Sequence, residues 1–404
     1  MIADTARHVV IVGAGPAGAR CADRLAAGGA RVTLIGAERA HPYNRVALSQ
    51  YLAGDVEEHA LTTHHAEHLA SSRINWRPGT QVAGLDRATK DVLVEGGERI
   101  AYDGLVLATG AQPVRLPFPG AGSAHVLMYR TLGDVQQMLA HAATGGDAVV
   151  IGGGLLGLEA AVGLARRGMR VTVLHAVDRL MERQLDGGAA ALLERRLAGQ
   201  GIAVITNAKT TAIEADAVLL ADGRCVPAKI VVMAVGIRPN ADLARAAGLP
   251  VNRGILVDDG MRTADPAIWA IGECAEHDGQ CVGLVAPSFA QAEVAAASIL
   301  GQAARYVAVS DATALKVAGA GVWSAGETGE GELIVLDDGE AGQYRRLLVR
   351  GDRLVGAMLY GEVGDAPWYL KLIKEGRPIG AARDVLAFGP AFQPPGFADE
   401  EWAA

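Results

Sequence analysis

Residues 9–38 read VVIVGAGPAGARCADRLAAGGARVTLIGAE, and residues 149–177 read VVIGGGLLGLEAAVGLARRGMRVTVLHAV. Each stretch is an apolar run, a glycine-rich turn, an alanine- and leucine-rich segment and a second apolar run. This order predicts a buried strand, a helix and a second, parallel strand. The last glycines of the two turns, Gly18 and Gly157, are 157 − 18 = 139 residues apart. The sequence therefore predicts an α/β protein in which one strand–helix–strand unit occurs twice.

The first turn has the spacing GxGxxG, formed by Gly13, Gly15 and Gly18. In such a turn the first glycine permits a tight bend, the second lets the backbone approach a pyrophosphate, and the third lets the helix pack closely on the strand. Backbone N–H groups and the partial positive charge at the helix N-terminus then bind the phosphates. Glu38 follows Gly18 by 38 − 18 = 20 residues, which is the spacing of an acid that accepts ribose hydroxyls.

The second turn repeats the spacing with Gly152, Gly154 and Gly157, but its second apolar run ends in His175 rather than in an acid. A carboxylate at that place favours NADH, because it binds the ribose 2′-OH and repels a 2′-phosphate. His175 favours neither nucleotide clearly, so NADH and NADPH both stay open. Two dinucleotide sites in one chain are typical of proteins that move electrons from one dinucleotide to the other.

The 404-residue chain is 50% hydrophobic and 20% charged, which is the composition of a globular protein. Its formal net charge of −8 argues against a nucleic-acid partner, because such a partner requires a basic surface. The sequence has no apolar run as long as a membrane span and no signal peptide before the first strand, so we expect no membrane association and a cytoplasmic location. The four cysteines include no CxxC pair, which argues against a redox dithiol and against a cysteine-ligated metal centre.

The phrases RLPFPG at 115–120 and IRPN at 237–240 are typical of domain crossovers. The second strand–helix–strand unit lies between them, so it interrupts the first dinucleotide domain, to which the chain returns near residue 241. The last part of the chain alternates apolar and polar runs before a helix around 366–376, which predicts an antiparallel sheet with helices. We predict three domains: a first dinucleotide domain from 1–114 and 241–312, a second from 115–240, and a C-terminal α+β domain from 313–404.

Five further phrases extend the pattern over nearly the whole chain: HPYNRVALSQYLAG (41–54), LMERQLD (180–186), MAVGIRPN (233–240), AIWAIGECAEH (267–277) and GDAPWYLKLIKEGRPIGAARDVLAFG (364–389). With the two turns, they resemble the flavoprotein reductases of the glutathione reductase structural class. Within that class the chain resembles the FAD/NAD(P)H part of assimilatory nitrite reductase large subunits and the related rubredoxin and ferredoxin reductases. The resemblance implies two Rossmann-like domains, one for FAD and one for NAD(P)H, followed by an α+β interface domain.

The resemblance also implies site residues. For FAD these are Gly13, Gly15, Pro16, Ala17, Gly18, Glu38, Arg45, Gln50, Val82, Ala108, Thr109, Gly110, Arg130, Gly272, Glu273 and Val285. For NAD(P)H they are Gly152, Gly154, Leu155, Leu156, Gly157, Glu159, His175 and Gly236. Gln50 stands where many ferredoxin reductases have a lysine beside the flavin, so that cation is absent here. Glu159 matches a family glutamate near the nicotinamide, and we expect it to orient the carboxamide. Gln50 and Glu159 are thus the two candidate catalytic residues.

The reaction implied by the resemblance is hydride transfer from NAD(P)H to FAD, followed by transfer of single electrons to a carrier. Nitrite reductases of this type continue into an iron–sulfur and sirohaem module, and these 404 residues hold no such cysteines. We therefore expect a separate partner, either a small iron–sulfur carrier (ferredoxin or rubredoxin) or a nitrite or nitrate reductase. Two alternatives stay open: an NADH oxidase or peroxidase-like flavoenzyme, which requires a redox cysteine near the flavin, and a non-enzymatic, NAD(H)-responsive flavin-binding interaction protein.

Four histidines cluster in one segment, at positions 59, 64, 65 and 68. His64 and His68 have the i, i+4 spacing of a helical metal pair, but the pattern fixes no acidic or cysteine partner for them. We therefore predict a surface helix here and no metal site.

Overall fold

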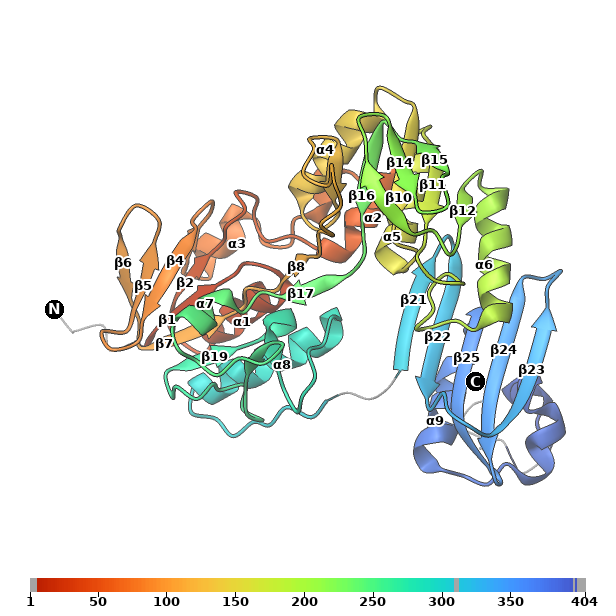
Figure 1. Ribbon diagram of the computed structural model, residues 1–404. Coiled ribbons are helices and arrows are strands. Elements are labelled where there is room, and N and C mark those ends of the chain that lie inside the picture. Colours follow the sequence, from red (N-terminus) through yellow and green to blue (C-terminus); the bar gives the residue numbers. More distant parts are fainter. Residues whose placement is uncertain (1–5, 309–311, 395–396, 398–404) are drawn as a thin grey trace. The chain divides into compact units, whose positions relative to one another are not determined.

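The protein is described by a computed structural model over residues 6–308, 312–394 and 397. It forms two compact units, and Figure 1 labels most of their helices and strands. Unit 1 comprises Met1–Val114, Arg130–Gln137 and Gly236–Val309, and unit 2 comprises Arg115–Tyr129, Met138–Val235 and Ser310–Ala404. Among the helices of the described ranges, none is long and apolar enough to cross a membrane.

Unit 1 is built on a parallel sheet with the strand order β19–β7–β1–β2–β3. Its strands are β1 (His8–Val12), β2 (Arg31–Ile35), β3 (Ile74–Arg77), β7 (Gly104–Leu107) and β19 (Ile268–Ala270). Val9, Val10 and Ile11 follow one another in β1, and all three are buried. Such continuous apolar runs belong to a parallel sheet that is covered on both faces.

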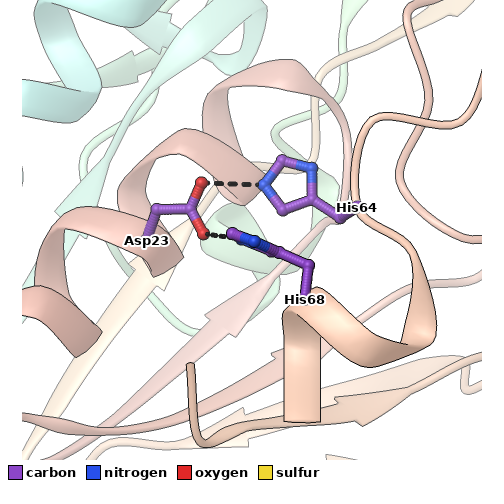
Figure 2. A group of neighbouring side chains, drawn as sticks. All are labelled: Asp23, His64 and His68. Atoms are coloured by element: carbon purple, nitrogen blue, oxygen red, sulfur yellow. Dashed lines mark hydrogen bonds and ion pairs between the residues drawn. The ribbon is translucent and has the colours of Figure 1, made fainter. Parts of the chain in front are cut away.

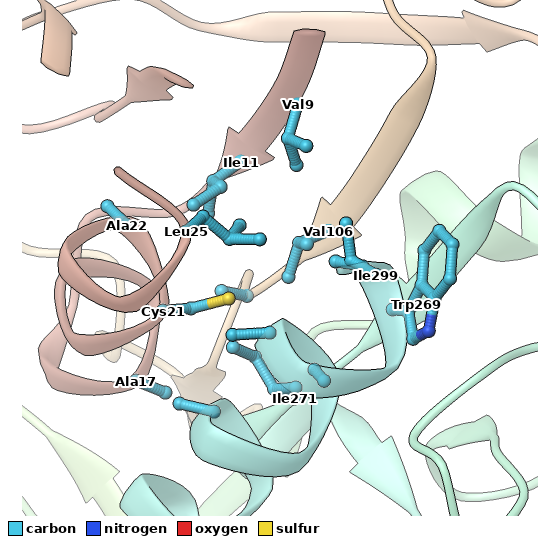
Figure 3. Close-up of a cluster of buried hydrophobic side chains, with 14 of the residues drawn as sticks. Val9, Ile11, Ala17, Cys21, Ala22, Leu25, Val106, Trp269, Ile271 and Ile299 are labelled. Carbon is cyan, nitrogen blue, oxygen red and sulfur yellow. The ribbon is translucent and has the colours of Figure 1, made fainter. Parts of the chain in front are cut away.

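Helix α1 (Pro16–Ala27) and helix α8 (Val285–Ile299) share one hydrophobic core with this sheet. Figure 3 shows Cys21 and Leu25 of α1 next to Ile11 of β1 and Val106 of β7. Cys21 is buried in this cluster, and burial raises the pKa of its thiol, so Cys21 is a packing residue. The other elements of unit 1 are α2 (Leu48–Ala53), α3 (Ala66–Ser71), α7 (Asp242–Ala246), the antiparallel sheet β4 (Val82–Asp86), β5 (Asp91–Val94) and β6 (Arg99–Ala101), the antiparallel pair β8 (Ala111–Pro113) and β17 (Ile237–Pro239), and the parallel pair β18 (Ile255–Leu256) and β20 (Ala275–Glu276).

Unit 2 contains a second parallel sheet, with the strand order β12–β11–β10–β16–β9. Its strands are β9 (Val126–Met128), β10 (Asp147–Ile151), β11 (Arg170–Leu174), β12 (Ala203–Ile205) and β16 (Ile230–Met233). Helix α5 (Leu155–Arg166) connects β10 to β11, and helix α6 (Gly187–Gly199) connects β11 to β12. Helix α4 (Leu132–Ala142) precedes β10; it begins in unit 1 and ends in unit 2. Strands β13 (Thr210–Ile213), β14 (Ala217–Leu220) and β15 (Cys225–Pro227) form an antiparallel sheet.

The C-terminal part of unit 2 is an antiparallel sheet with the order β21–β22–β25–β24–β23, followed by helix α9 (Ala366–Glu375). Its strands are β21 (Ala312–Val317), β22 (Ala320–Gly326), β23 (Glu332–Asp338), β24 (Gln343–Arg350) and β25 (Arg353–Gly361). Trp368, Tyr369 and Leu372 of α9 pack into one core with Leu347 of β24 and Leu359 of β25.

Two parallel sheets of repeated strand–helix–strand units and a C-terminal antiparallel sheet confirm the predicted fold class. The prediction of one helix for the histidine segment was wrong. That segment forms a short 3-10 helix (Glu58–Leu61), a turn and then α3. Thr62 has an extended backbone and ends the first helix, and His65 is extended and starts the second, so His64 lies outside α3.

Candidate functional site

The first glycine turn joins β1 to α1 in unit 1. A Cβ at Gly13, where φ is +113°, would lie 2.1 Å from the carbonyl oxygen of Ala108, and a Cβ at Gly18 would lie 1.9 Å from the carbonyl oxygen of Gly13. Both contacts are with backbone, so no other residue fits at either position. Gly15 differs, because a Cβ there meets nothing within 4 Å. Gly13 and Gly18 therefore lie tightly against the backbone, while the position of Gly15 leaves open space in front of helix α1.

Helix α1 begins next to that space, with Gly15 as its N-cap and Pro16 as its first residue. No side chain caps this helix end, and Pro16 has no N–H group. The N–H groups of the first turn and their partial positive charge thus face the space beside Gly15, which suits a phosphate group.

Glu38 follows β2 and is held by two donors. The hydroxyl of Tyr43 donates to Oε2 of Glu38 at 2.8 Å, and Nη2 of Arg45 donates to Oε1 at 2.8 Å. Burial raises the pKa of Tyr43, so its hydroxyl stays protonated and continues to donate. A carboxylate accepts more than two hydrogen bonds, so Glu38 keeps acceptor capacity for a ribose hydroxyl.

A second polar group joins the turns after β7 and β19 to Arg130, which lies just before α4. Arg130 and Glu273 form an ion pair in which Nη1 and Nη2 of the guanidinium donate to the two carboxylate oxygens, although 143 residues separate them in the sequence. Gly110, with φ of +67°, lies against this pair, since a Cβ there would be 3.5 Å from Nη2 of Arg130. Nη1 of Arg45 donates to the backbone oxygen of Arg130 at 2.8 Å, which joins this group to Glu38.

Two hydrogen bonds, each between a side chain and the backbone, fix the turns that follow β7 and β19. The hydroxyl of Thr109 donates to the backbone oxygen of Asn240 at 2.6 Å, and the N–H of Gly272 donates to Oε1 of Gln291 at 2.7 Å. Gly272 has φ of +76°, and a Cβ there would lie 3.2 Å from the Cβ of Ala17 in α1. The structure thus brings together most of the predicted flavin residues in unit 1. Three predicted flavin residues lie outside this hydrogen-bonded group: Val82 at the start of β4, Val285 at the start of α8, and Gln50 on the exposed surface of α2.

The second glycine turn, in unit 2, has the same clearances as the first. A Cβ at Gly152, where φ is +122°, would lie 2.3 Å from the backbone oxygen of Ala234, and one at Gly157 would lie 1.9 Å from that of Gly152. A Cβ at Gly154 meets nothing within 4 Å. No side chain caps α5, which begins at Leu155 and whose next residue, Leu156, is 41% exposed.

His175 directly follows β11, next to this turn, and is held in one tautomer. The N–H of Gly153 donates to Nδ1 of His175 at 3.1 Å, so that nitrogen carries no proton. Nε2 therefore carries the proton and donates to Oε2 of Glu182 at 3.2 Å. The end of β11 thus presents a neutral imidazole paired with a carboxylate. Glu182 was not among the predicted site residues, although the phrase LMERQLD contained it.

Two other predicted NAD(P)H residues are placed as follows. Glu159 is half-buried on α5, two residues after Gly157. Gly236 belongs to unit 1 and has φ of +116°.

Cys274 directly follows Glu273 but lies in the core. It is buried, and its thiol donates to the backbone oxygens of Leu107 at 3.4 Å and Ile271 at 3.3 Å. Burial raises the pKa of the Cys274 thiol, which keeps it protonated and a poor nucleophile. This cysteine therefore serves packing in the described structure.

Each turn fits the pyrophosphate of a dinucleotide, because the space that a Cβ at Gly15 or Gly154 would enter lies beside an uncapped helix N-terminus. The acidic residue Glu38 stands where a ribose is expected in the first turn, and the His175–Glu182 pair stands there in the second.

Comparison with known proteins agrees with this arrangement. The family model for pyridine nucleotide-disulphide oxidoreductases matches residues 7–298, and the model for the rubredoxin NAD+ reductase C-terminal domain matches residues 312–377. The chain is 38% identical to a nitrite reductase [NAD(P)H] of Bacillus subtilis, over 96% of this chain and 50% of the relative, so it spans about half the length of that protein. It is 35% identical to the ferredoxin–NAD(+) reductase component of the anthranilate 1,2-dioxygenase system of Burkholderia cepacia, over 96% of each chain.

Among solved structures, the covalent putidaredoxin reductase–putidaredoxin complex is similar, with a TM-score of 0.84 and 29% identity over 95% of this chain and 99% of the other. The family model for residues 7–298 covers well over half of the 404 residues, and it includes both glycine turns. The chain belongs to the pyridine nucleotide-disulphide oxidoreductase family.

Proposed function

We propose that the protein is an FAD-dependent NAD(P)H oxidoreductase that delivers electrons to a separate redox protein. The observation that carries this proposal is the pair of glycine turns with matching clearances, one in each unit. Members of the family use FAD and NAD(P)H, and one turn is available for each. We also propose a cytoplasmic location, where NAD(P)H is available to the enzyme.

We assign FAD to unit 1. The space beside Gly15 and the N-terminus of α1 would hold the pyrophosphate, and Glu38 would accept a ribose hydroxyl while Tyr43 and Arg45 fix its carboxylate. The Arg130–Glu273 pair would lie beside the flavin end, where Glu273 can accept hydrogen bonds from hydroxyl groups. The predicted contacts of Val82 and Val285, and the position of Gln50 beside the flavin, belong to this assignment.

We assign NAD(P)H to unit 2. Gly154 and the N-terminus of α5 would hold its pyrophosphate, and His175 with Glu182 would meet the adenosine ribose. Glu159 would orient the nicotinamide carboxamide by accepting from its amide group. The bound cofactors supply the redox chemistry, which is hydride transfer from NAD(P)H to FAD and release of single electrons, while the protein binds and orients them.

The electron acceptor is proposed from the relatives. A ferredoxin–NAD(+) reductase component matches over 96% of its length, and a solved reductase–putidaredoxin complex has the same fold, which supports a small iron–sulfur carrier. The nitrite reductase relative supports a nitrite or nitrate reductase as the other partner class.

A peroxidase-like activity is the less favoured candidate. It requires an accessible redox cysteine beside the flavin, and Cys274, the cysteine nearest to the flavin residues in sequence, is buried and donates to two backbone oxygens.

The test is an anaerobic titration of the FAD-loaded protein with NADH and with NADPH, followed by flavin absorbance. We expect the reduced nucleotide to bleach the flavin, and a ferredoxin or a rubredoxin added afterwards to be reduced while the flavin colour returns. A protein that binds no FAD would overturn the cofactor assignment. Bleaching by NADH without reduction of any carrier, and reoxidation by peroxide instead, would support the peroxidase-like activity.

A further inference from the structure

Asp23, His64 and His68 form a cluster on unit 1 that the proposed flavin chemistry does not use. Figure 2 shows Asp23 on α1 between two imidazoles, one from the turn before α3 and one from α3 itself. Oδ2 of Asp23 is 2.9 Å from Nε2 of His64, and Oδ1 is 2.8 Å from Nε2 of His68. The three potential ligand atoms all lie within 4.8 Å of one another. Two imidazole nitrogens and one carboxylate oxygen are a donor set that suits zinc and similar transition metals.

The orientation of His64 is fixed from its other side. The hydroxyl of Thr63 donates its one hydrogen to the backbone oxygen of Pro42 at 3.0 Å. The same oxygen is 2.9 Å from Nδ1 of His64, so it can only accept there, and Nδ1 of His64 carries the proton. In the neutral ring, Nε2 then directs a lone pair at the Asp23 carboxylate, and two lone pairs at that distance repel each other. A cation shared by the two groups removes the repulsion, either the proton of an imidazolium–carboxylate ion pair or a metal ion.

This is the arrangement of a metal-binding histidine, whose second nitrogen donates to a neighbouring oxygen and thereby fixes the ring. The separations also suit a metal ion. Ligand arms of about 2.0–2.1 Å in tetrahedral geometry place neighbouring donors about 3.3 Å apart. The two nitrogen–oxygen distances, 2.9 Å and 2.8 Å, lie close to that value on its short side, and all three donor atoms lie within 4.8 Å of one another. The side chain of His68 is 46% exposed and that of His64 is 12% exposed, so the cluster has an entrance on the His68 side.

We infer that Asp23, His64 and His68 bind a divalent transition-metal ion such as Zn²⁺, with Thr63 as the residue that orients His64. The three protein ligands leave a fourth position for water. The ion links α1 to the segment before α3, which is 41 residues further along the chain. Its role is structural, because the metal joins two surface elements of unit 1.

A second cluster of this kind, Asp259, His277 and Asp278, is less suited to a metal. Asp259 already pairs with Nε of Arg305 at 2.9 Å, which places a positive charge at the position that a metal would take. The side chain of Asp278 is 85% exposed, and its oxygen is 3.7 Å from Nδ1 of His277.

The test measures Zn²⁺ binding to the full-length, FAD-loaded chain without a histidine tag. The protein is first treated with EDTA and dialysed, and Zn²⁺ is then titrated by calorimetry, with metal content measured by mass spectrometry after gel filtration. We expect one Zn²⁺ per chain and a rise of the melting temperature that EDTA reverses. His68→Ala and Asp23→Asn are expected to abolish stoichiometric binding. Thr63→Val is expected to weaken binding by about 10- to 100-fold, because it removes only the partner that orients His64.

His65→Ala is the matched control, because His65 is the residue directly after His64 and does not belong to the cluster. It is expected to bind Zn²⁺ like the wild type. Far-UV circular dichroism of the metal-free variants shows whether each one is folded, and His68→Ala changes a side chain that is 46% exposed. Equal Zn²⁺ affinity in His68→Ala and His65→Ala, or no stoichiometric binding by the folded wild type, would overturn the inference. Neither the Zn²⁺ titration nor the metal analysis depends on NAD(P)H oxidation, so the test of the metal site is independent of the proposed activity.

Discussion

Gly15 and Gly154 are the positions at which substitution separates cofactor binding from folding. Gly15 has φ of −69° and ψ of −179°, an extended conformation that alanine adopts, and a Cβ there meets nothing within 4 Å. Gly15→Ala should therefore fold normally. Alanine restricts the unfolded chain, which stabilises by about 0.4–1 kcal/mol, and it is a poorer N-cap than glycine by a similar amount, so we expect a net change within about 1 kcal/mol.

The effect on FAD should be larger. The added methyl group enters the space assigned to the pyrophosphate, and overpacking of a close contact costs about 1–3 kcal/mol. At about 1.4 kcal/mol for each factor of ten, FAD affinity should fall by about 5- to 150-fold. Gly154→Ala should raise the KM for the nicotinamide nucleotide by a similar factor and leave FAD affinity unchanged.

The assay is fluorescence titration of the apoprotein with FAD, together with KM for NAD(P)H in the FAD-saturated enzyme and thermal unfolding of each variant. Gly122→Ala is the control, because a Cβ at that exposed glycine also meets nothing within 4 Å and it lies in neither turn. The assignment is refuted if Gly15→Ala binds FAD as tightly as the wild type. It is also refuted if Gly154→Ala, and not Gly15→Ala, is the variant that loses FAD.

Three further predictions concern single groups. Because neutral His175 is paired with the Glu182 carboxylate, the end of β11 should repel a 2′-phosphate. We therefore expect kcat/KM to be higher for NADH than for NADPH, and the ratio of the two values to be smaller in Glu182→Gln. A wild-type preference for NADPH would contradict this. Cys274→Ala should keep NAD(P)H-dependent flavin reduction, because the thiol is buried and protonated, and complete loss of reduction in a folded variant would show a chemical role. The backbone N–H of Thr89 is the main cause that lowers the pKa of Asp86 from 3.8 to about 2, so Asp86 stabilises the fold above pH 3.8 and this contribution is lost as the pH falls towards 2. The free energy of unfolding, measured with denaturant, should therefore differ between wild type and Asp86→Asn at neutral pH and become equal at about pH 2. A difference that stays constant with pH would contradict the lowered pKa of Asp86.

Much of this fold could be predicted because its signals are local. The apolar runs around residues 9–12 and 149–151 predict strands by themselves, and each glycine turn follows its strand directly. The start of α1 at Pro16 and the end of the same helix before Gly28 also follow from residues a few positions apart.

The arrangement of the polar site residues could not be predicted in the same way. Arg130 and Glu273 were both candidates, but their ion pair joins the residues before α4 to the turn after β19, which are 143 residues apart in the sequence. The partner of His64 is Asp23, an acid on a different helix whose position in the sequence looks like an ordinary exposed helix residue. Such pairs depend on tertiary contacts, which periodicity and spacing do not contain.

The strand order of unit 1 also has a consequence for the newly made protein. Strand β19 begins 268 − 107 = 161 residues after the end of β7, its neighbour in the sheet. During synthesis, β7 therefore waits with an unpaired edge until residues 268–270 leave the ribosome, whereas all five strands of the parallel sheet in unit 2 have already emerged by residue 233. Unpaired edges of apolar strands invite association with other chains. A translation product that stops before residue 268 should thus be prone to aggregate, even though it holds both glycine turns.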